Sequence, residues 1–430
     1  MRITRLSKLV ATAAIGAVAL SACGGDADGD TNGGGDSGQV ELRFSWWGSD
    51  HRVQTTNEII DMFHEEHPDI RINAEFGDWA GYWDQLATQT AAGDAPDIIQ
   101  MDDKYLREYA DRGALLDLSD VDTSQFDEAT IENGTTDAGL VGITTGLNTL
   151  VLVANPSLIE EAGLEMPDDT TWTWDDYAEI TATVSEETEA FGSADPNEPG
   201  GFQIWLRQHG KHLTTEEGEL GFEADDVVEY FEYYLQLMED GGLPPAAVLS
   251  EYQNSGPDQS LTGTNRAAFG YWWTNQLAGL AEASGEDLVP LRFPSQSGNA
   301  EENGLWYKSA MLLSASARTE HPEEVKTFID FFVNNVEAAS INGTDRGLPA
   351  NMEVREAVLE DLEGVELDSA EFISSVEDEV SAQPVEPVPA MGFSALQDIL
   401  YRYEIEVFFE RQSPEQAAES MIREMESELN

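Results

Sequence analysis

Residues 42–52 read LRFSWWGSDHR. Apolar and polar residues alternate as far as Trp46, which is the two-residue period of a strand with one buried face. Trp47 interrupts the alternation and Gly48 follows it, so we expect the strand to end here. Apolar residues then recur at helical spacing over 53–67, where we expect a helix. A strand followed directly by a helix is the first half of a unit that builds parallel sheets.

The same succession of strand and helix repeats along the following residues. We expect further strands over 70–76 and 96–101, and helices over 82–92 and 104–112. A β-α-β-α-β-α order is typical of a parallel sheet covered by helices. The sequence therefore predicts an α/β fold.

Elements of both kinds continue to the end of the chain. We expect a strand over 147–155 and a long aromatic helix over 227–238. A capping box predicts a helix from Trp174, and Pro322 predicts the first turn of another. Two helices are expected at the C-terminal end, the last of them opened by a second capping box at 413–416.

Length and charge limit the class of protein. A chain of 430 residues is too long for one ordinary core and fits two domains or lobes. The 84 acidic residues against 21 basic ones give a formal net charge of −63, which repels phosphate backbones and argues against nucleic-acid binding. Because the acidic residues are spread along the chain, they indicate a solvated surface, for which a salt-rich habitat is one explanation.

The N-terminal residues have the pattern of an export signal. Basic residues precede a short apolar run over 9–20, too short to span a bilayer. The sequence LSAC, ending at Cys23, resembles the bacterial lipobox, which implies a signal peptide over 1–22, cleavage after Ala22 and a lipid on Cys23. A plain signal peptide with an incidental cysteine is the alternative. Residues 23–39 would then be the lipidated cysteine and a flexible linker, and the body would stand anchored on the outer face of the cytoplasmic membrane.

The sequence contains little that indicates catalysis. The nucleophile-elbow, phosphate-loop and dinucleotide-binding motifs are absent from it. HEEH at 64–67 is one residue short of the zinc-protease spacing, and the remaining histidines are scattered. We therefore expect no cofactor, no metal site and no catalytic residue.

Ten tryptophans, many of them in short clusters, are the most informative feature. Indole rings can pack in a core, or they can stack on the apolar C–H faces of sugars while polar neighbours bind the hydroxyls. Clusters beside glycine, aspartate, asparagine and arginine favour the second interpretation, since packing them in a core would bury the polar neighbours too.

The order and spacing of several segments resemble one family over essentially the whole mature body. The segments are LRFSWWGSDHR, FHEEHPDIRINAEFGDWAGYWDQLATQTAAGDAPDIIQMD, GALLDLS, LNTLVLVAN, AAFGYWWTNQL, HPEEVKTFIDFFVNN and DRGLPAN. Together they resemble the family 1 extracellular solute-binding proteins, the sugar-binding lipoproteins of ABC importers. WWG together with WAGYWDQL resembles a branch of this family that binds pectin or rhamnogalacturonan oligosaccharides. Acidic sugars would need basic partners, and Arg52, Lys308 and Arg346 lie in matching segments. A neutral oligosaccharide is an equally good candidate for the ligand.

This resemblance implies a two-lobe periplasmic-binding-protein-like fold of type II, with a ligand cleft between the lobes and hinge crossings. Lobe one would hold 40–147 and 292–335, and lobe two 148–291 and 336–430. Of the adjacent pair Trp46 and Trp47, we expect one indole to enter the cleft. The ligand contacts that the resemblance implies are Trp46, Trp47, Asp50, Arg52, Trp79, Trp83, Asp102, Asn148, Trp272, Trp273, Asn275, Trp306, Tyr307 and Arg346.

The expected function is capture of an oligosaccharide and its delivery to ABC transporter permease subunits, by a monomer that is not an enzyme. Two alternatives remain from the sequence. One is a surface enzyme acting on polysaccharide, and the other is a lectin-like receptor that serves no transporter.

Overall fold

The computed structural model describes residues 39–429, except 195–198, 216, 254, 384, 385, 387 and 388. Gln39–Asn430 forms one compact unit. The predicted signal peptide, Cys23 and all of the linker before Gln39 lie outside the described residues. Within the described part, no helix combines the length and the apolar character needed to cross a bilayer.

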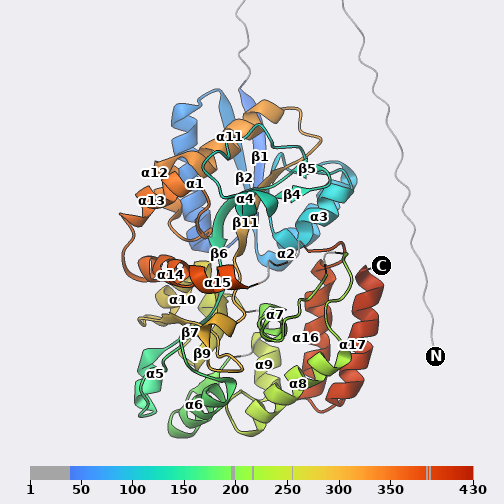
Figure 1. Cartoon of the computed structure of the whole chain (residues 1–430). Helices are drawn as coiled ribbons and strands as arrows, with labels where there is room; N and C mark the ends of the chain where they lie inside the picture. Colours follow the sequence, from blue (N-terminus) through green and yellow to red (C-terminus); the bar gives the residue numbers. More distant parts are fainter. Residues whose placement is uncertain are drawn as a thin grey trace, which may run out of the picture. The chain divides into compact units, whose positions relative to one another are not determined.

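One sheet has six strands in the order β12-β6-β11-β3-β1-β2. Four of them, β1, β2, β6 and β11, are labelled in Figure 1. β1 lies between β2 and β3 and runs parallel to both, which confirms the parallel arrangement predicted for the first three strands. β11 returns antiparallel between β3 and β6, so the sheet as a whole is mixed. The strands are β1 (Val40–Trp47), β2 (Ile70–Gly77), β3 (Ile98–Met101), β6 (Ile143–Asn148), β11 (Lys308–Ala315) and β12 (Leu348–Pro349).

Each of the first three strands is followed by a helix whose first turn is capped by a side chain. Ser49 accepts from the Arg52 amide, Asp78 from the Gly81 amide and Asp102 from the Lys104 amide. The caps explain why each chain segment turns at the carboxyl edge of the sheet. The helices around this sheet are α1 (Asp50–Glu66), α2 (Trp79–Ala92), α3 (Asp103–Asp111), α4 (Glu128–Glu132), α11 (Pro322–Asn334), α12 (Val336–Asn342) and α13 (Met352–Leu359).

The two faces of this sheet have separate cores. Phe44 and Trp46 pack on one face with Phe328. Trp47 packs on the other with Trp83. Adjacent strand residues point to opposite faces, which is why the two neighbouring tryptophans separate.

The second sheet has four strands in the order β10-β7-β9-β8. They are β7 (Leu150–Ala154), β8 (Phe191–Ser193), β9 (Ala267–Trp273) and β10 (Val289–Leu291). In Figure 1, α16 and α17 are the red pair beside α8. The helices of this half are α5 (Pro156–Glu161), α6 (Trp174–Glu187), α7 (Pro199–Gln208), α8 (Ala224–Glu239), α9 (Ala246–Tyr252), α10 (Leu277–Ser284), α14 (Gly364–Ser375), α15 (Glu377–Ala382), α16 (Ser394–Phe408) and α17 (Pro414–Leu429).

Short elements complete the described chain. β4 (Thr135–Thr136) and β5 (Gly139–Leu140) form a small hairpin. Three single turns of 3₁₀ helix, η1 (Pro257–Gln259), η2 (Thr274–Gln276) and η3 (Ala300–Glu302), lie in connections.

The strand predicted over 147–155 is wrong as a single element. It is two strands, β6 and β7, which belong to different sheets and are separated by Thr149 alone. The Thr149 amide donates to the Thr274 hydroxyl at 3.3 Å, and the Thr274 amide donates to the Thr149 carbonyl at 3.0 Å. The first crossing between sheets is therefore short and hydrogen-bonded.

The predicted segment boundaries at 292 and 336 need correction. Phe293 and Trp306 pack in the core of the four-stranded sheet, so the chain returns to the six-stranded sheet only at Lys308. β12 pairs with β6, and α12 packs on α1, so the chain stays with the six-stranded sheet beyond 336. The sequence could not place these points because strand pairing is a long-range interaction.

Candidate functional site

A cavity of about 2500 Å³ lies between the two sheets. Trp47, Asp102 and Asn148 reach it from the carboxyl ends of β1, β3 and β6 or directly after them. Lys308 lines it from the start of antiparallel β11, and Trp273 from the end of β9. Ligands of open α/β sheets bind at this edge, and the volume exceeds the roughly 300–1,000 Å³ of ordinary small-molecule sites.

Aromatic rings form the cavity wall on the side of the six-stranded sheet. The Trp47 ring meets the Trp79 ring edge to face, with centroids 5.0 Å apart, and Trp83 stacks on Tyr105 at 3.8 Å. The Lys104 ammonium lies 4.5 Å from the Trp79 ring centroid. Each ring is held by another ring or by a cation, so this surface is ordered before a ligand arrives.

A second aromatic wall belongs to the four-stranded sheet. Trp273 and Trp306 meet at right angles with ring centroids 5.7 Å apart, and the Trp272 indole donates to the Thr262 hydroxyl at 3.1 Å. Both Trp272 and Trp273 are half-buried, which leaves part of each ring in the cavity. The two lobes thus present indole surface to the same space.

A charged cluster connects the two walls. The Lys308 ammonium lies 3.1 Å from an Asp103 oxygen, 3.4 Å from an Asp102 oxygen and 4.8 Å from the Trp273 ring centroid. Burial raises the pKa of the Asp103 carboxyl to about 6, and the neighbouring Asp102 carboxylate adds to the rise, although Lys308 opposes it. The pKa of Asp102 is lowered despite burial, because Lys308 and Lys104 favour its charged form.

Polar side chains from both sheets meet beside the first crossing. Asn148 donates to the Asn275 side-chain oxygen at 2.9 Å, and Asn275 donates to the Asp345 carbonyl at 3.2 Å. Asn148 is 2% exposed, and its own side-chain oxygen has no hydrogen-bond partner among the described residues. A buried acceptor of this kind is rare unless another donor satisfies it.

Trp46 and Arg346 do not line the cavity, which corrects their expected role as ligand contacts. Both side chains are 0% exposed. Trp46 packs in the core because it faces the side of β1 opposite to Trp47. Arg346 donates to the side chains of Gln100, Asn342 and Thr56 behind the cavity. Burial lowers the pKa of Arg346 to about 9, and the nearby Arg52 charge adds to this.

The structure brings the other predicted residues together. Trp47, Asp50, Arg52, Trp79, Trp83, Asp102, Asn148, Trp272, Trp273, Asn275, Trp306 and Tyr307 all line the cavity. That they contact ligand stays a prediction.

The sequence did not lead us to several residues that line the cavity. Asp103 and Lys104 directly follow Asp102, so the position after the third strand was a usable signal for them. Arg207 and Arg355 had no such signal, because each reaches the cavity from the middle or end of a helix far along the chain.

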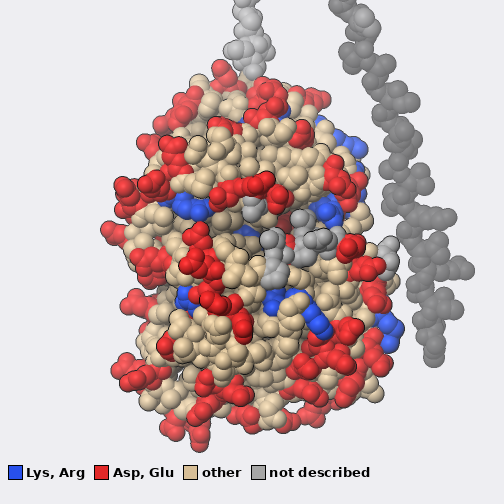
Figure 2. Space-filling view, in the orientation of Figure 1, with Lys and Arg blue, Asp and Glu red and all other residues tan. Residues whose placement is uncertain are grey.

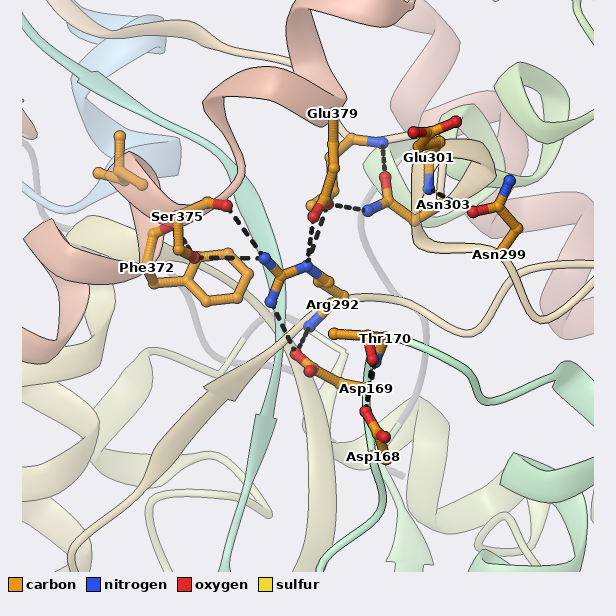
Figure 3. A network of polar contacts seen from close by, with 12 residues as sticks. Asp168, Asp169, Thr170, Arg292, Asn299, Glu301, Asn303, Phe372, Ser375 and Glu379 are labelled. Atoms are coloured by element: carbon orange, nitrogen blue, oxygen red, sulfur yellow. Dashed lines mark hydrogen bonds and ion pairs between the residues drawn. The ribbon is translucent and has the colours of Figure 1, made fainter.

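A network of polar contacts around Arg292 joins α14 and α15 to the segment after β10 (Figure 3). Arg292 follows β10 and its Nε contacts both Glu379 carboxylate oxygens, at 2.8 and 3.0 Å, while its Nη2 donates to the Ser375 carbonyl at 3.1 Å. Asp169 accepts from the Arg292 amide at 2.9 Å. α15 is thereby joined to the four-stranded sheet, and its Glu377 and Val380 line the cavity.

The surface charge is uneven in one view of the molecule. Acidic side chains are spread over the face shown in Figure 2, whereas lysines and arginines gather near its middle.

Among the described residues, no group of three or more His, Cys, Asp or Glu side chains is arranged to hold a metal ion.

The family follows from a comparison with family models. Residues 58–364 match the model described as bacterial extracellular solute-binding protein. The chain belongs to this family. Its members are solute-binding proteins of transport systems that act outside the cytoplasm, and the two-lobe α/β fold predicted for this solute-binding protein is confirmed by its structural neighbours.

Two relatives of this solute-binding protein share about a quarter of its residues over the matched regions. An uncharacterized lipoprotein of Streptomyces antibioticus is 27% identical over 69% of this chain and 67% of its own. The arabinooligosaccharide-binding protein of Bacillus subtilis is 26% identical over 49% of this chain, and the match spans only 50% of that protein.

Solved structures match nearly the whole chain. A family 1 extracellular solute-binding protein from Alicyclobacillus acidocaldarius is 27% identical, with a TM-score of 0.66, over 91% of this chain and 98% of its own. An oligogalacturonide-binding protein from Yersinia enterocolitica, solved with digalacturonic acid, has a TM-score of 0.80 and 22% identity over the same shares. The second likeness is one of fold.

Proposed function

We propose that this solute-binding protein captures an oligosaccharide in the cavity between its lobes and delivers it to the permease subunits of an ABC importer. One observation carries the proposal: indole rings from both sheets face the same cavity, with polar side chains between them. Sugar rings present apolar C–H faces that indoles cover, and hydroxyls that amides and carboxylates bind.

Two further observations support an oligosaccharide over a single sugar. The cavity volume of about 2500 Å³ is larger than one sugar ring needs. Relatives carry names that point the same way, among them the arabinooligosaccharide-binding protein of Halalkalibacterium halodurans and the diacetylchitobiose-binding protein of Streptomyces coelicolor. Delivery to a permease rests on the family.

In this proposal the protein binds its ligand without changing it. Calorimetric titration with arabinooligosaccharides, diacetylchitobiose, malto-oligosaccharides and oligogalacturonides tests it. We expect at least one of them to bind and to be recovered with an unchanged mass. Absence of binding across the panel would contradict sugar capture, whereas a shortened or unsaturated product would favour the surface-enzyme alternative.

We also propose that the mature protein is a monomer anchored through a lipid on Cys23. The LSAC sequence supports the anchor, and one relative is named a lipoprotein. Cys23→Ser should release the protein from the membrane fraction into the medium, and Ser21→Ala, which keeps the cysteine, should not. Equal membrane retention of Cys23→Ser and the parent would exclude a lipid at this residue.

A further inference from the structure

We infer that the ligand of this cavity is an uncharged oligosaccharide, and that sugars with carboxylates on their rings are excluded. The inference rests on the function proposed above and specifies its ligand. Carboxylate recognition in proteins is built mainly on arginine and lysine, because charge-assisted and forked pairs are the strong ones. Five such side chains line the cavity among the described residues: Arg52, Lys104, Arg207, Lys308 and Arg355.

Arg52 is occupied at each of its nitrogens. Its Nε lies 2.6 Å from one Asp345 carboxylate oxygen, and its Nη2 lies 3.0 Å from the other. Nη2 also donates to the Asp345 carbonyl at 2.8 Å, and Nη1 donates to the Trp47 carbonyl at 3.1 Å. The two guanidinium nitrogens that would bind a ligand carboxylate already bind the carboxylate of Asp345.

Arg207 and Lys308 are occupied in the same way. Arg207 Nη1 lies 2.5 Å from a Glu386 oxygen, and its Nε donates to the Gly304 carbonyl at 2.8 Å, with the side chain only 2% exposed. Lys308 is shared between the carboxylates of Asp102 and Asp103. A ligand anion at either cation would compete with a protein carboxylate that already neutralises it, and that carboxylate lies in a poorly solvated place.

The remaining two cations are hydrogen-bonded to neutral groups of the protein. Lys104 donates to the Gln397 side-chain oxygen at 2.8 Å and lies over the Trp79 ring. Arg355 donates from Nε to the Pro349 carbonyl at 2.7 Å, whereas its Nη2 is buried and has no hydrogen-bond partner among the described residues. Burial lowers the pKa of Arg355, which means that its charge is poorly solvated. The carboxylates of Asp127 and Glu377 act on Arg355 and favour its charged form.

Acidic side chains outnumber these cations around the cavity. Exposed acidic residues among its lining include Asp50, Asp78, Asp84, Asp258 and Glu282. In a chain of net charge −63, they give the opening a negative potential that repels a polyanionic sugar. Sugar hydroxyls, in contrast, are donors that carboxylates accept.

The arrangement of charged side chains around the cavity does not favour a positively charged sugar either. The most deeply placed carboxylates, Asp345, Glu386, Asp102 and Asp103, already have protein cations. Those that remain are exposed, apart from the half-buried Glu366, and an ion pair with an exposed carboxylate contributes little. An uncharged chain that stacks on the indoles leaves the ion pairs of Arg52, Arg207 and Lys308 intact.

The experiment compares sugars that share a backbone and differ in charge. Calorimetry is run with oligogalacturonide against its methyl ester, with deacetylated chitobiose against diacetylchitobiose, and with arabinooligosaccharides and malto-oligosaccharides as further uncharged probes. We expect the tightest binder to be uncharged and at least about 100-fold tighter than every charged sugar. Its affinity should change less than about twofold between low and high sodium chloride, since no ligand charge is screened.

Tightest binding of the oligogalacturonide, or of the deacetylated amine, would overturn the inference while leaving sugar capture intact. A steep loss of affinity with salt for the tightest ligand would also overturn it. Absence of binding by every sugar would instead contradict the proposed function, and with it this inference. The outcomes are therefore distinguishable.

Discussion

Arg52 and Asp345, 293 residues apart in the chain, form a two-pronged ion pair, with Nε to Oδ2 at 2.6 Å and Nη2 to Oδ1 at 3.0 Å. The pair joins the first turn of α1 to the segment between α12 and β12, directly beside the cavity. Although burial opposes it, Arg52 lowers the pKa of the Asp345 carboxyl below its ordinary value. The pair therefore stabilises the folded state at neutral pH, and this contribution is lost only as the pH falls through the lowered pKa.

Replacing one member of the pair should be costly. Arg52→Gln leaves the buried Asp345 carboxylate with only the longer ion pair to Arg346, at 3.8 Å, and we expect the free energy of unfolding to fall by about 3 kcal/mol. Urea unfolding followed by circular dichroism measures it. Arg71→Gln, at an exposed position of β2, serves as the matched control and should stay within about 0.5 kcal/mol of the parent. Equal losses in the two variants would show that the pair contributes nothing special.

Trp46 should contribute to the stability of the fold and not to ligand binding. Trp46→Ala removes a fully buried indole from the core of the six-stranded sheet, and we expect a loss of about 3–5 kcal/mol in the free energy of unfolding. The affinity of the remaining folded protein for sugar should stay close to that of the parent. Calorimetry below the melting temperature, corrected for the folded fraction, checks this. A large loss of intrinsic affinity would mean that Trp46 reaches the ligand after all.

Trp273 should behave in the opposite way. Its half-buried ring lines the cavity, so Trp273→Ala should weaken sugar binding by roughly 1–3 kcal/mol, by analogy with aromatic stacking on nucleobases. Phe76→Ala is the control, because Phe76 is 57% exposed at the end of β2 and does not line the cavity. Unchanged affinity of Trp273→Ala for the best ligand of the panel would remove this ring from the binding surface.

Asp103 should make stability depend on pH in the acidic range. Its folded pKa is about 6, above the ordinary value of 3.8, so between these values the folded state binds more protons than the unfolded chain. Stability from this group is complete below the ordinary pKa and is lost as the pH rises through about 6. Asp103→Asn should therefore be more stable than the parent at pH 7, by about 1–3 kcal/mol, and nearly equal to it at pH 4.

Denaturant unfolding at a series of pH values tests this. Asp111→Asn, an exposed carboxylate at the other end of α3, should show no such trend. A stability difference for Asp103→Asn that does not grow between pH 4 and pH 7 would contradict the raised pKa.

Salt should stabilise the fold. With a net charge of −63, repulsion between surface carboxylates destabilises the compact state at low ionic strength, and salt screens it over a Debye length of about 10 Å at 0.1 M. We expect the melting temperature to rise from low to moderate sodium chloride, and an uncharged osmolyte at equal osmolality to give a smaller rise. A melting temperature that is flat with sodium chloride would mean that repulsion is unimportant.

Local signals in the sequence were sufficient for much of the fold. The helix expected at 53–67 is α1, Asp50–Glu66, and the strand at 70–76 is β2, Ile70–Gly77, because apolar period and capping residues act over a few neighbours. The capping box at Thr173 and Asp176 is present as predicted. The long-range arrangement was not predicted: β6 and β7 adjoin at Thr149, and they belong to different sheets because their pairing partners differ.

The site shows the same division. The sequence pattern was sufficient to predict where strands end, and therefore to predict that Trp47 and Asp102 line the cavity. The ion pairs Arg52–Asp345 and Arg207–Glu386 could not be predicted, because their members are 293 and 179 residues apart in the chain. Sequence reasoning therefore left Arg52 available for an acidic sugar, and the structure gives it a partner.

The interrupted course of the chain has a consequence for how such proteins diversify. The described chain leaves the six-stranded sheet at Thr149, returns at Lys308 and leaves again after α13. A gene recombined at one breakpoint would exchange fragments of both lobes and separate β6 from β11, its partner. Exchange of a whole lobe between homologues needs several simultaneous breakpoints. New ligand preferences are therefore more accessible through point substitutions around the cavity than through shuffling, and chimera design should respect the same three junctions.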